Sequence, residues 1–171
     1  MNNILMNTEM TKAILDGRKV QTRKVIKAKL ETLPHGYFNI NMSDKDYVRI
    51  GVGLDKKEII DFMLKNTKTK YQVGEILNLL QLSLLENGDK VKFATGAKLK
   101  ITNVRVEKLW DLSIYDIIDE GCPPEYTNMV TGTKKDTVEW YKNLWNKTAP
   151  KGYKWEDNPY IFVYEFERVE K

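Results

Sequence analysis

The sequence has few of the residues that form disulfides and metal sites. It contains one cysteine, Cys122, and one histidine, His35, in 171 residues. A single cysteine excludes an internal disulfide, and the chain lacks the Cys and His clusters from which structural zinc sites are built. We therefore expect no metal site, and nothing in the sequence indicates a cofactor.

Long apolar runs and common nucleotide-binding motifs are also missing. No stretch approaches the ~20 apolar residues that cross a bilayer, and the first residues, MNNILMN, do not resemble a signal peptide. We expect a cytoplasmic protein that does not contact a membrane. The chain contains neither GxGxxG nor GxxxxGK(S/T), so a dinucleotide-binding fold and a P-loop lose their main support.

The remaining composition is typical of one globular domain. Apolar residues make up 42% of the chain and charged residues 30%. A length of 171 residues fits a single domain, 1–171, because domains average about 150 residues. The sequence shows no internal repeat and no low-complexity linker.

The positive charge is concentrated near the N-terminus. The net charge is only +4, so affinity for nucleic acid has to be judged from where the charges lie. Residues 12–29 carry seven cations and one acid, Asp16. The cations are Lys12, Arg18, Lys19, Arg23, Lys24, Lys27 and Lys29.

Local signals in the first half predict a helix, a strand and an insertion. Residues 8–16 form a predicted helix with Thr8 as its N-cap and Gly17 as its stop, and residues 20–26 are predicted to be extended. A capping box at residues 55–58 opens a further helix. We interpret residues 28–70 as a helical insertion over a barrel.

The second half predicts most of the sheet. The apolar run 76–85 is followed by Asn87-Gly88, a strong hairpin signal, and residues 99–106 alternate with a slip at Thr102-Asn103 that indicates a bulge. Ser113 caps a short helix that ends at Gly121, a helix covers about 136–145, and residues 160–169 form a strand with one aromatic face. Strands with helices in their connections predict an α+β barrel rather than a doubly wound sheet.

Four blocks of the chain resemble the ASCH family, in particular its phage and prophage members. They are NTEM through ILDGRKVQTR at 7–23, YQVGE at 71–75, ITNVRVE through EG at 101–121, and LW, NP and the last strand at 144–169. The resemblance implies a PUA-like β-barrel of five or six strands with a cleft between the first helix and the sheet. Family members are proposed to bind RNA, and a few are hydrolases, including an amidohydrolase of acetylated cytidine and a ribonuclease.

The resemblance also implies a catalytic group. In that amidohydrolase a Lys, a Thr three residues later and a distant Glu are proposed to act together, and they match Lys19, Thr22 and Glu120 here. Larger phage relatives often have Trp-Val-Arg-Glu where this chain has ILNLLQ at 76–81, so no residue is carried over from that stretch.

The chemistry of such a group sets a geometric condition. A Thr hydroxyl becomes a nucleophile only if a base takes its proton, and a Lys can be that base if burial or nearby cations lower its pKa. Lys19 and Thr22 converge only if the chain bends after Gly17, because residues three apart in a straight strand face opposite sides. Glu120 is placed in the last turn of its helix, where the helix dipole disfavours an acid.

Several interpretations of these residues stay open. Arg18, Lys19 and Arg23 are equally consistent with a solvated basic face paired to Glu120. As a binding module, the protein would hold RNA or a modified nucleoside, with Arg18, Arg23 and Lys24 on phosphates. As a hydrolase, it would use the Lys, Thr and Glu group. As a non-catalytic phage accessory protein, it would bind a host protein through residues 28–70.

Overall fold

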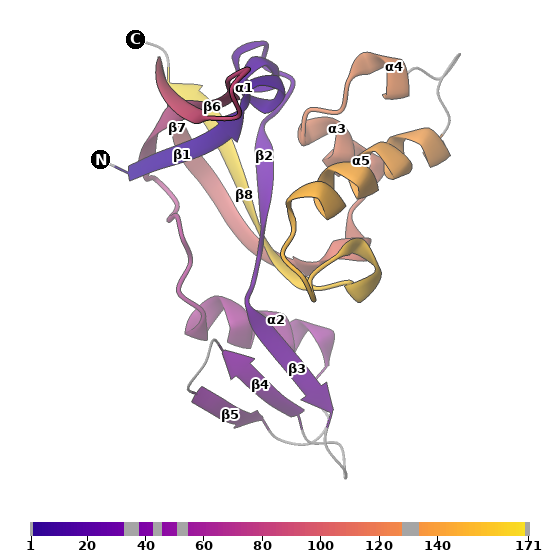
Figure 1. Cartoon of the computed structure of the whole chain (residues 1–171). Helices are drawn as coiled ribbons and strands as arrows, with labels where there is room; N and C mark the ends of the chain where they lie inside the picture. The colour runs from indigo at the N-terminus through magenta and orange to yellow at the C-terminus, as the bar shows by residue number, and fades with distance from the viewer. Residues whose placement is uncertain (1, 33–37, 43–45, 51–54, 128–133, 170–171) are drawn as a thin grey trace.

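The protein is built on one curved five-stranded sheet. The computed structural model describes residues 2–32, 38–42, 46–50, 55–127 and 134–169. The strand order is β1-β6-β7-β8-β2, and the sheet curls into a half-barrel whose two edge strands are β1 and β2 (Figure 1). The predicted α+β class and five strands are confirmed, but the described strands leave the barrel open on one side.

The elements have the following bounds. The main sheet contains β1 (Asn2–Asn7), β2 (Gln21–Val25), β6 (Ile76–Leu84), β7 (Lys90–Lys108) and β8 (Tyr160–Val169). A second sheet contains β3 (Ala28–Thr32), β4 (Phe38–Met42) and β5 (Asp46–Ile50). The helices are α1 (Thr8–Leu15), α2 (Lys56–Asn66), α3 (Ile114–Asp119), α4 (Pro124–Thr127) and α5 (Lys134–Thr148), with single 3-10 turns at Leu109–Asp111 and Trp155–Asp157.

Strand β8 holds the two cores of the protein together. Its aromatic residues Phe162, Tyr164 and Phe166 pack inside the half-barrel, whereas Ile161 and Val163 pack on the outer face beneath α3 and α5. Successive residues of a strand point to opposite faces, so a strand buried on both sides contributes to both cores. The aromatic face predicted for residues 160–169 is therefore confirmed as core.

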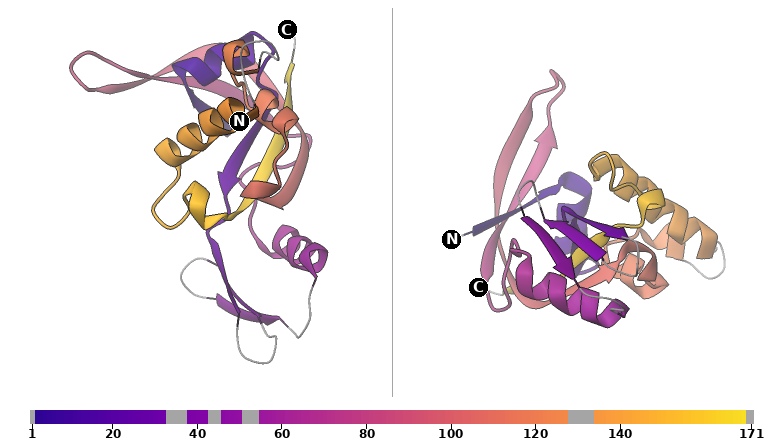
Figure 2. Two further views of the ribbon diagram at one scale, coloured as in Figure 1. Left: turned by 90° about the vertical axis from the view of Figure 1, so that its right-hand side faces the viewer. Right: turned by 90° about the horizontal axis from the view of Figure 1, so that it is seen from below.

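The sheet is regular except at two bulges. β1 pairs with β6 in parallel, and the other neighbouring strands pair antiparallel. The β7–β8 register shifts between Ile101 and Asn103, which confirms the predicted bulge, and the β6–β7 register shifts between Asn78 and Leu80. Beyond the second bulge, the β6–β7 hairpin extends away from the body of the protein (Figure 2).

The segment predicted as an insertion lies below the half-barrel in Figure 1. It contains α2, whose capping box of Asp55 and Glu58 is confirmed, and also the three strands β3–β5, which were not predicted. Ile59 and Met63 of α2 are buried in the core of the half-barrel. The side chains of residues 28–54, which make up most of the segment predicted to contact a host protein, lie outside the described residues.

The N-terminal region differs from the sequence prediction in two ways. The N-cap of α1 is Asn7 rather than Thr8, because the Asn7 side chain accepts a hydrogen bond of 2.7 Å from the Met10 amide. Strand β1, which precedes this cap, was not predicted at all. Among the described helices, none is long and apolar enough to cross a membrane.

Gly121 is expected to be the least replaceable glycine of the described chain. Its φ is +93°, and a Cβ there would lie 3.0 Å from Ala13 Cβ and 3.1 Å from Lys19 Cβ. Gly88 is a matched control, because its φ is +87° but a Cβ would meet nothing within 4 Å. Gly88→Ala should cost about 1 kcal/mol for the left-handed backbone, and Gly121→Ala about 1–3 kcal/mol more for overpacking. Urea unfolding of both variants measures this, and equal losses would contradict it.

Candidate functional site

A pocket of about 250 Å³ lies at the open side of the half-barrel. We call it the seam pocket, because residues of both edge strands, β1 and β2, line it together with residues of α1 and α5. Its polar lining includes Asn7, Lys19, Thr22, Arg23, Lys24, Glu120, Tyr141 and Thr148, and its apolar lining includes Leu5, Met6, Met10, Leu82, Leu144 and Trp145. The pocket thus lies where the sheet has no strand-to-strand pairing.

At the base of the seam pocket, Lys19 and Glu120 form a buried ion pair. Lys19 Nζ donates to Glu120 Oε2 at 2.5 Å, to the Glu120 carbonyl at 3.0 Å and to the Gln21 carbonyl at 2.8 Å. Both side chains are almost fully buried. Burial lowers the pKa of Lys19, while the Glu120 carboxylate opposes that change. All three ammonium protons of Lys19 therefore have acceptors.

The backbone brings these two residues together. After α1, Gly17 adopts a φ of +77°, and the chain turns so that Lys19 forms an isolated antiparallel bridge with Glu120. Glu120 is the C-cap of α3, and its neighbour Gly121 contacts Lys19 closely because it has no side chain. The bend after Gly17 that the sequence required is present.

Arg23 extends the ion pair into a network. It lies 3.1 Å from Glu120 Oε1, 2.9 Å from Glu107 Oε1 and 2.9 Å from Asp116 Oδ1, with its side chain 1% exposed. Burial alone would lower the pKa of Arg23, but these carboxylates outweigh it and raise the pKa. On the outer side, Arg105 also contacts Asp116, at 2.9 Å. The charge of Arg23 is thus balanced inside the protein.

Lys24 differs from its neighbours because it lines the seam pocket without a partner. Its ammonium makes no hydrogen bond or ion pair with another residue in the described ranges. Burial lowers the pKa of Lys24, and the cations Lys70 and Lys19 lower it further, against a smaller effect of Glu120. The charge of an unpaired, partly buried ammonium is one that an anion could balance.

Two hydroxyl groups of the seam pocket are also available to a ligand. Neither the Thr22 nor the Tyr141 hydroxyl has a hydrogen-bond partner among the described residues, although both side chains are largely buried. Burial raises the pKa of Tyr141, and the Glu120 charge raises it further, so its phenol stays protonated and remains a donor. The Thr148 hydroxyl, by contrast, lies 3.2 Å from the Leu144 carbonyl.

The structure therefore separates the residues predicted from the sequence. Lys19, Thr22, Arg23, Lys24 and Glu120 all line the seam pocket. Arg18 does not take part in it, because its guanidinium donates to the Gly121 carbonyl at 3.3 Å and pairs with Asp16 at 3.5 Å.

Other residues of the site were not predicted from the sequence. Glu107 and Asp116 neutralise Arg23, and Tyr141 contributes a hydroxyl to the pocket. The only local signal for Glu107 was its alternation with Arg105 along β7. The sequence explains Asp116 as a helix-capping residue and gives no signal for its ion pair with Arg23.

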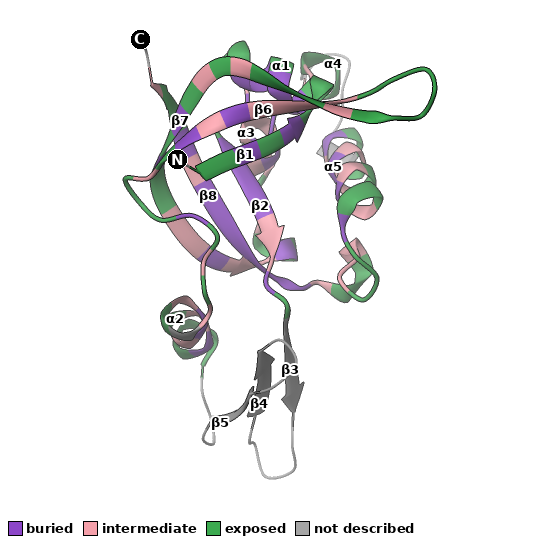
Figure 3. Ribbon diagram, turned by 60° about the vertical axis from the view of Figure 1, so that its left-hand side comes forward, coloured by how far each residue is buried: buried purple, intermediate pink, exposed green. Residues whose placement is uncertain are grey.

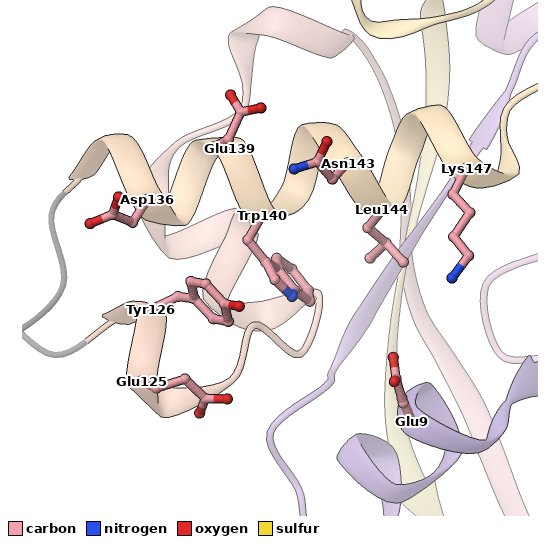
Figure 4. A pocket seen from close by; sticks show the side chains of 9 residues that line it. All are labelled: Glu9, Glu125, Tyr126, Asp136, Glu139, Trp140, Asn143, Leu144 and Lys147. Atoms are coloured by element: carbon pink, nitrogen blue, oxygen red, sulfur yellow. The ribbon is translucent and has the colours of Figure 1, made fainter.

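A larger cavity of about 670 Å³ lies on the other side of Leu144, between α4, α5 and the start of α1. Figure 4 shows its lining: Glu9, Glu125, Asp136 and Glu139, with the rings of Tyr126 and Trp140 and the amine of Lys147. Four acids against one cation disfavour an anionic ligand there. We therefore take the smaller seam pocket as the candidate functional site.

The buried pair predicts a strong coupling between Lys19 and Glu120. Lys19→Met should cost about 3–5 kcal/mol of unfolding free energy, because it leaves a buried carboxylate with one cation fewer. Glu120→Gln should also destabilise, and the double variant should lose less than the sum of the single losses by about 1 kcal/mol or more. Urea unfolding at neutral pH tests this, with Lys27→Met at an exposed position as the control. Additive losses would show that the two charges are not coupled.

No family model matches the chain, and no curated protein matches it either. Two crystal structures are similar to it in overall arrangement. The ASCH domain from Lactobacillus crispatus JV V101 shares 12% identity at a TM-score of 0.44, over 93% of this chain and 69% of that one. A DUF984 protein from Enterococcus faecalis V583 shares 12% identity at a TM-score of 0.48, over 99% of this chain and 77% of that one. Neither likeness assigns a role to a residue, and the phage or prophage character stays a prediction.

Proposed function

We propose that the protein binds a nucleotide, either free or as an unpaired nucleotide of RNA, in the seam pocket. The observation that carries this proposal is the unpaired ammonium of Lys24 in a pocket that otherwise offers hydroxyl groups and apolar walls. A nucleotide presents the matching groups: an anionic phosphate, a sugar with hydroxyls and a flat base.

The size and position of the seam pocket favour a single nucleotide. Its volume of about 250 Å³ is below the range of about 300–1,000 Å³ that is usual for small-molecule pockets, so it has room for no more than one nucleotide. Both edge strands have one side without a neighbouring strand in the described sheet. Apart from the Gln21 and Asn3 carbonyls, which accept hydrogen bonds from Lys19 and Tyr71, backbone groups on that side could pair with the edge of a base. Sequence-specific RNA recognition mostly uses unpaired bases in this way.

The neutralised residues have a supporting role in this proposal. Lys19 donates hydrogen bonds to a carboxylate and to carbonyls of the protein, and Arg23 pairs with carboxylates, so both residues hold the pocket wall in place. Lys24 is left to contact the phosphate. A rigid wall reduces the entropy that binding would otherwise cost.

Removal of the Lys24 charge is expected to weaken phosphate recognition selectively. Lys24→Gln should lower the affinity for ribonucleoside 5′-monophosphates about tenfold, since a charge-assisted hydrogen bond contributes about 1.5–3 kcal/mol, while the affinity for the nucleosides changes little. Lys27→Gln, at an exposed position outside the pocket, is the matched control. Calorimetric titration measures both series. Wild-type protein that binds none of the four monophosphates would refute the proposed function.

The lowered pKa of Lys24 gives the same binding a characteristic pH dependence. The Lys24 ammonium loses its proton at lower pH than an ordinary lysine, so with rising pH monophosphate affinity should fall earlier than it would for an ordinary lysine contact. Lys24→Arg keeps its charge throughout this range and should bind with a flat profile. Lys19 also has a lowered pKa and faces the pocket beside Glu120, so an unchanged fall in Lys24→Arg would assign the dependence to Lys19 instead.

A second candidate function is hydrolysis, and one observation favours it. Lys19 and Glu120 are in contact, and Thr22 lines the same pocket with a hydroxyl that no described residue binds. In such a reaction Thr22 Oγ1 would bond to an acyl carbon, neutral Lys19 would take the hydroxyl proton and return it to the leaving amine, and water would then cleave the ester. Burial lowers the pKa of Lys19, as a base requires, but its three hydrogen bonds favour the protonated form.

Thr22→Val provides the cleanest test of hydrolysis, because it removes the hydroxyl without breaking the buried ion pair. If the protein deacylates acetylated nucleosides such as acetylated cytidine, Thr22→Val should lower turnover at least ~100-fold at unchanged melting temperature. Thr148→Val removes another pocket hydroxyl and should leave turnover nearly intact. Product chromatography follows the reaction. Wild-type protein without turnover on these substrates would leave nucleotide binding as the function.

A further inference from the structure

The projecting β6–β7 hairpin carries two cations on the same face as the seam pocket. We call residues 80–94 the arm, because they lie beyond the β6–β7 bulge and extend past the rest of the protein (Figure 2). Within the arm, Leu82 pairs with Lys92 and Leu84 pairs with Lys90. Directly paired residues of neighbouring strands point to the same face, with Cβ atoms about 5 Å apart.

This register links the arm to the pocket. Leu82 lines the seam pocket, as does Asn7, its partner on β1. Lys92 therefore lies beside a pocket wall, and Lys90 lies two residues further out on the same side. The two lysines are exposed, and neither forms an ion pair with another described residue.

The arm as a whole is net neutral and exposes Leu84, Leu85 and Phe93, but its cations and its acids lie in different parts of it. Its acids, Glu86 and Asp89, occupy the turn, and Asp89 is engaged with Asn87. The strands carry the lysines, about 6.6 Å apart for residues two positions apart in a strand. Successive phosphates of an extended nucleic-acid strand can match such a spacing.

We infer that the arm binds the backbone phosphates that adjoin the nucleotide held in the seam pocket, so that the preferred ligand is single-stranded RNA rather than a free nucleotide. The inference rests on the proposed nucleotide binding and adds a second contact surface to it. Figure 3 shows the arm exposed along its outer part, which leaves it accessible to such a strand. The strand would enter the pocket with one base and continue over Lys92 and Lys90.

The test compares one nucleotide with an octamer of the same base. The probes are the ribonucleoside 5′-monophosphate that binds best and the corresponding single-stranded octaribonucleotide. Lys90→Gln combined with Lys92→Gln should weaken octamer binding at least tenfold and leave monophosphate affinity unchanged within about twofold. The log-log salt slope of octamer binding should fall by about 1.4, from about 0.7 for each neutralised phosphate of a single strand. Lys98→Gln, also exposed on β7 but outside the arm, is the control.

Each outcome decides between the two proposals. Unchanged octamer affinity with intact monophosphate binding overturns the role of the arm and leaves the pocket in place. An equal loss in Lys98→Gln, or an equal loss of monophosphate affinity in the arm variant, also overturns it. If the wild-type protein binds neither probe, the nucleotide-binding function itself fails.

Discussion

The buried carboxylate of Glu120, shared between Lys19 and Arg23, is the interaction on which the site depends. It joins three parts of the chain that are distant in sequence: the segment before β2, the end of α3, and, through Glu107, strand β7. A buried charge that loses its partner costs several kcal/mol, so these parts cannot separate without a large loss of stability. The edge strand β2 is thereby held in place without a strand on its outer side, and one wall of the seam pocket is fixed.

The sequence predicted those features whose cause is local. Capping boxes at Asp55 and Ser113, the hairpin at Asn87-Gly88 and the bulge near Thr102 each depend on a few neighbouring residues, and all four are present. Strand β1 was missed because it pairs in parallel with β6, more than 70 residues away, and its own sequence is short and mixed. Strands β3–β5 are only five residues long each, and although Phe38–Met42 alternates between apolar and polar residues, so short a pattern was not recognised as a strand.

The candidate site was predictable only in part, for a related reason. Lys19 and Glu120 were linked through the family resemblance, since nothing in the local sequence connects residues 101 positions apart. The seven cations of residues 12–29 suggested one basic surface. In the structure, however, Lys19 and Arg23 lie inside the protein with their charges balanced by acids from α3 and β7. A count of charges along a chain cannot distinguish a buried, neutralised cation from an available one.

This distinction also separates binding from catalysis at the seam pocket. A lysine that acts as a base has to be neutral when it takes a proton, yet neutral Lys19 would lose the ionic part of its contact with Glu120. The folded state would then be less stable during each catalytic cycle. Lys24 carries no such burden, because no described residue depends on its charge. The neutralised pair of Lys19 and Glu120 shapes the pocket wall, while the free ammonium of Lys24 faces the pocket, and this arrangement favours a binding site. Hydrolysis would have to use the pair, and this would weaken the fold that positions it.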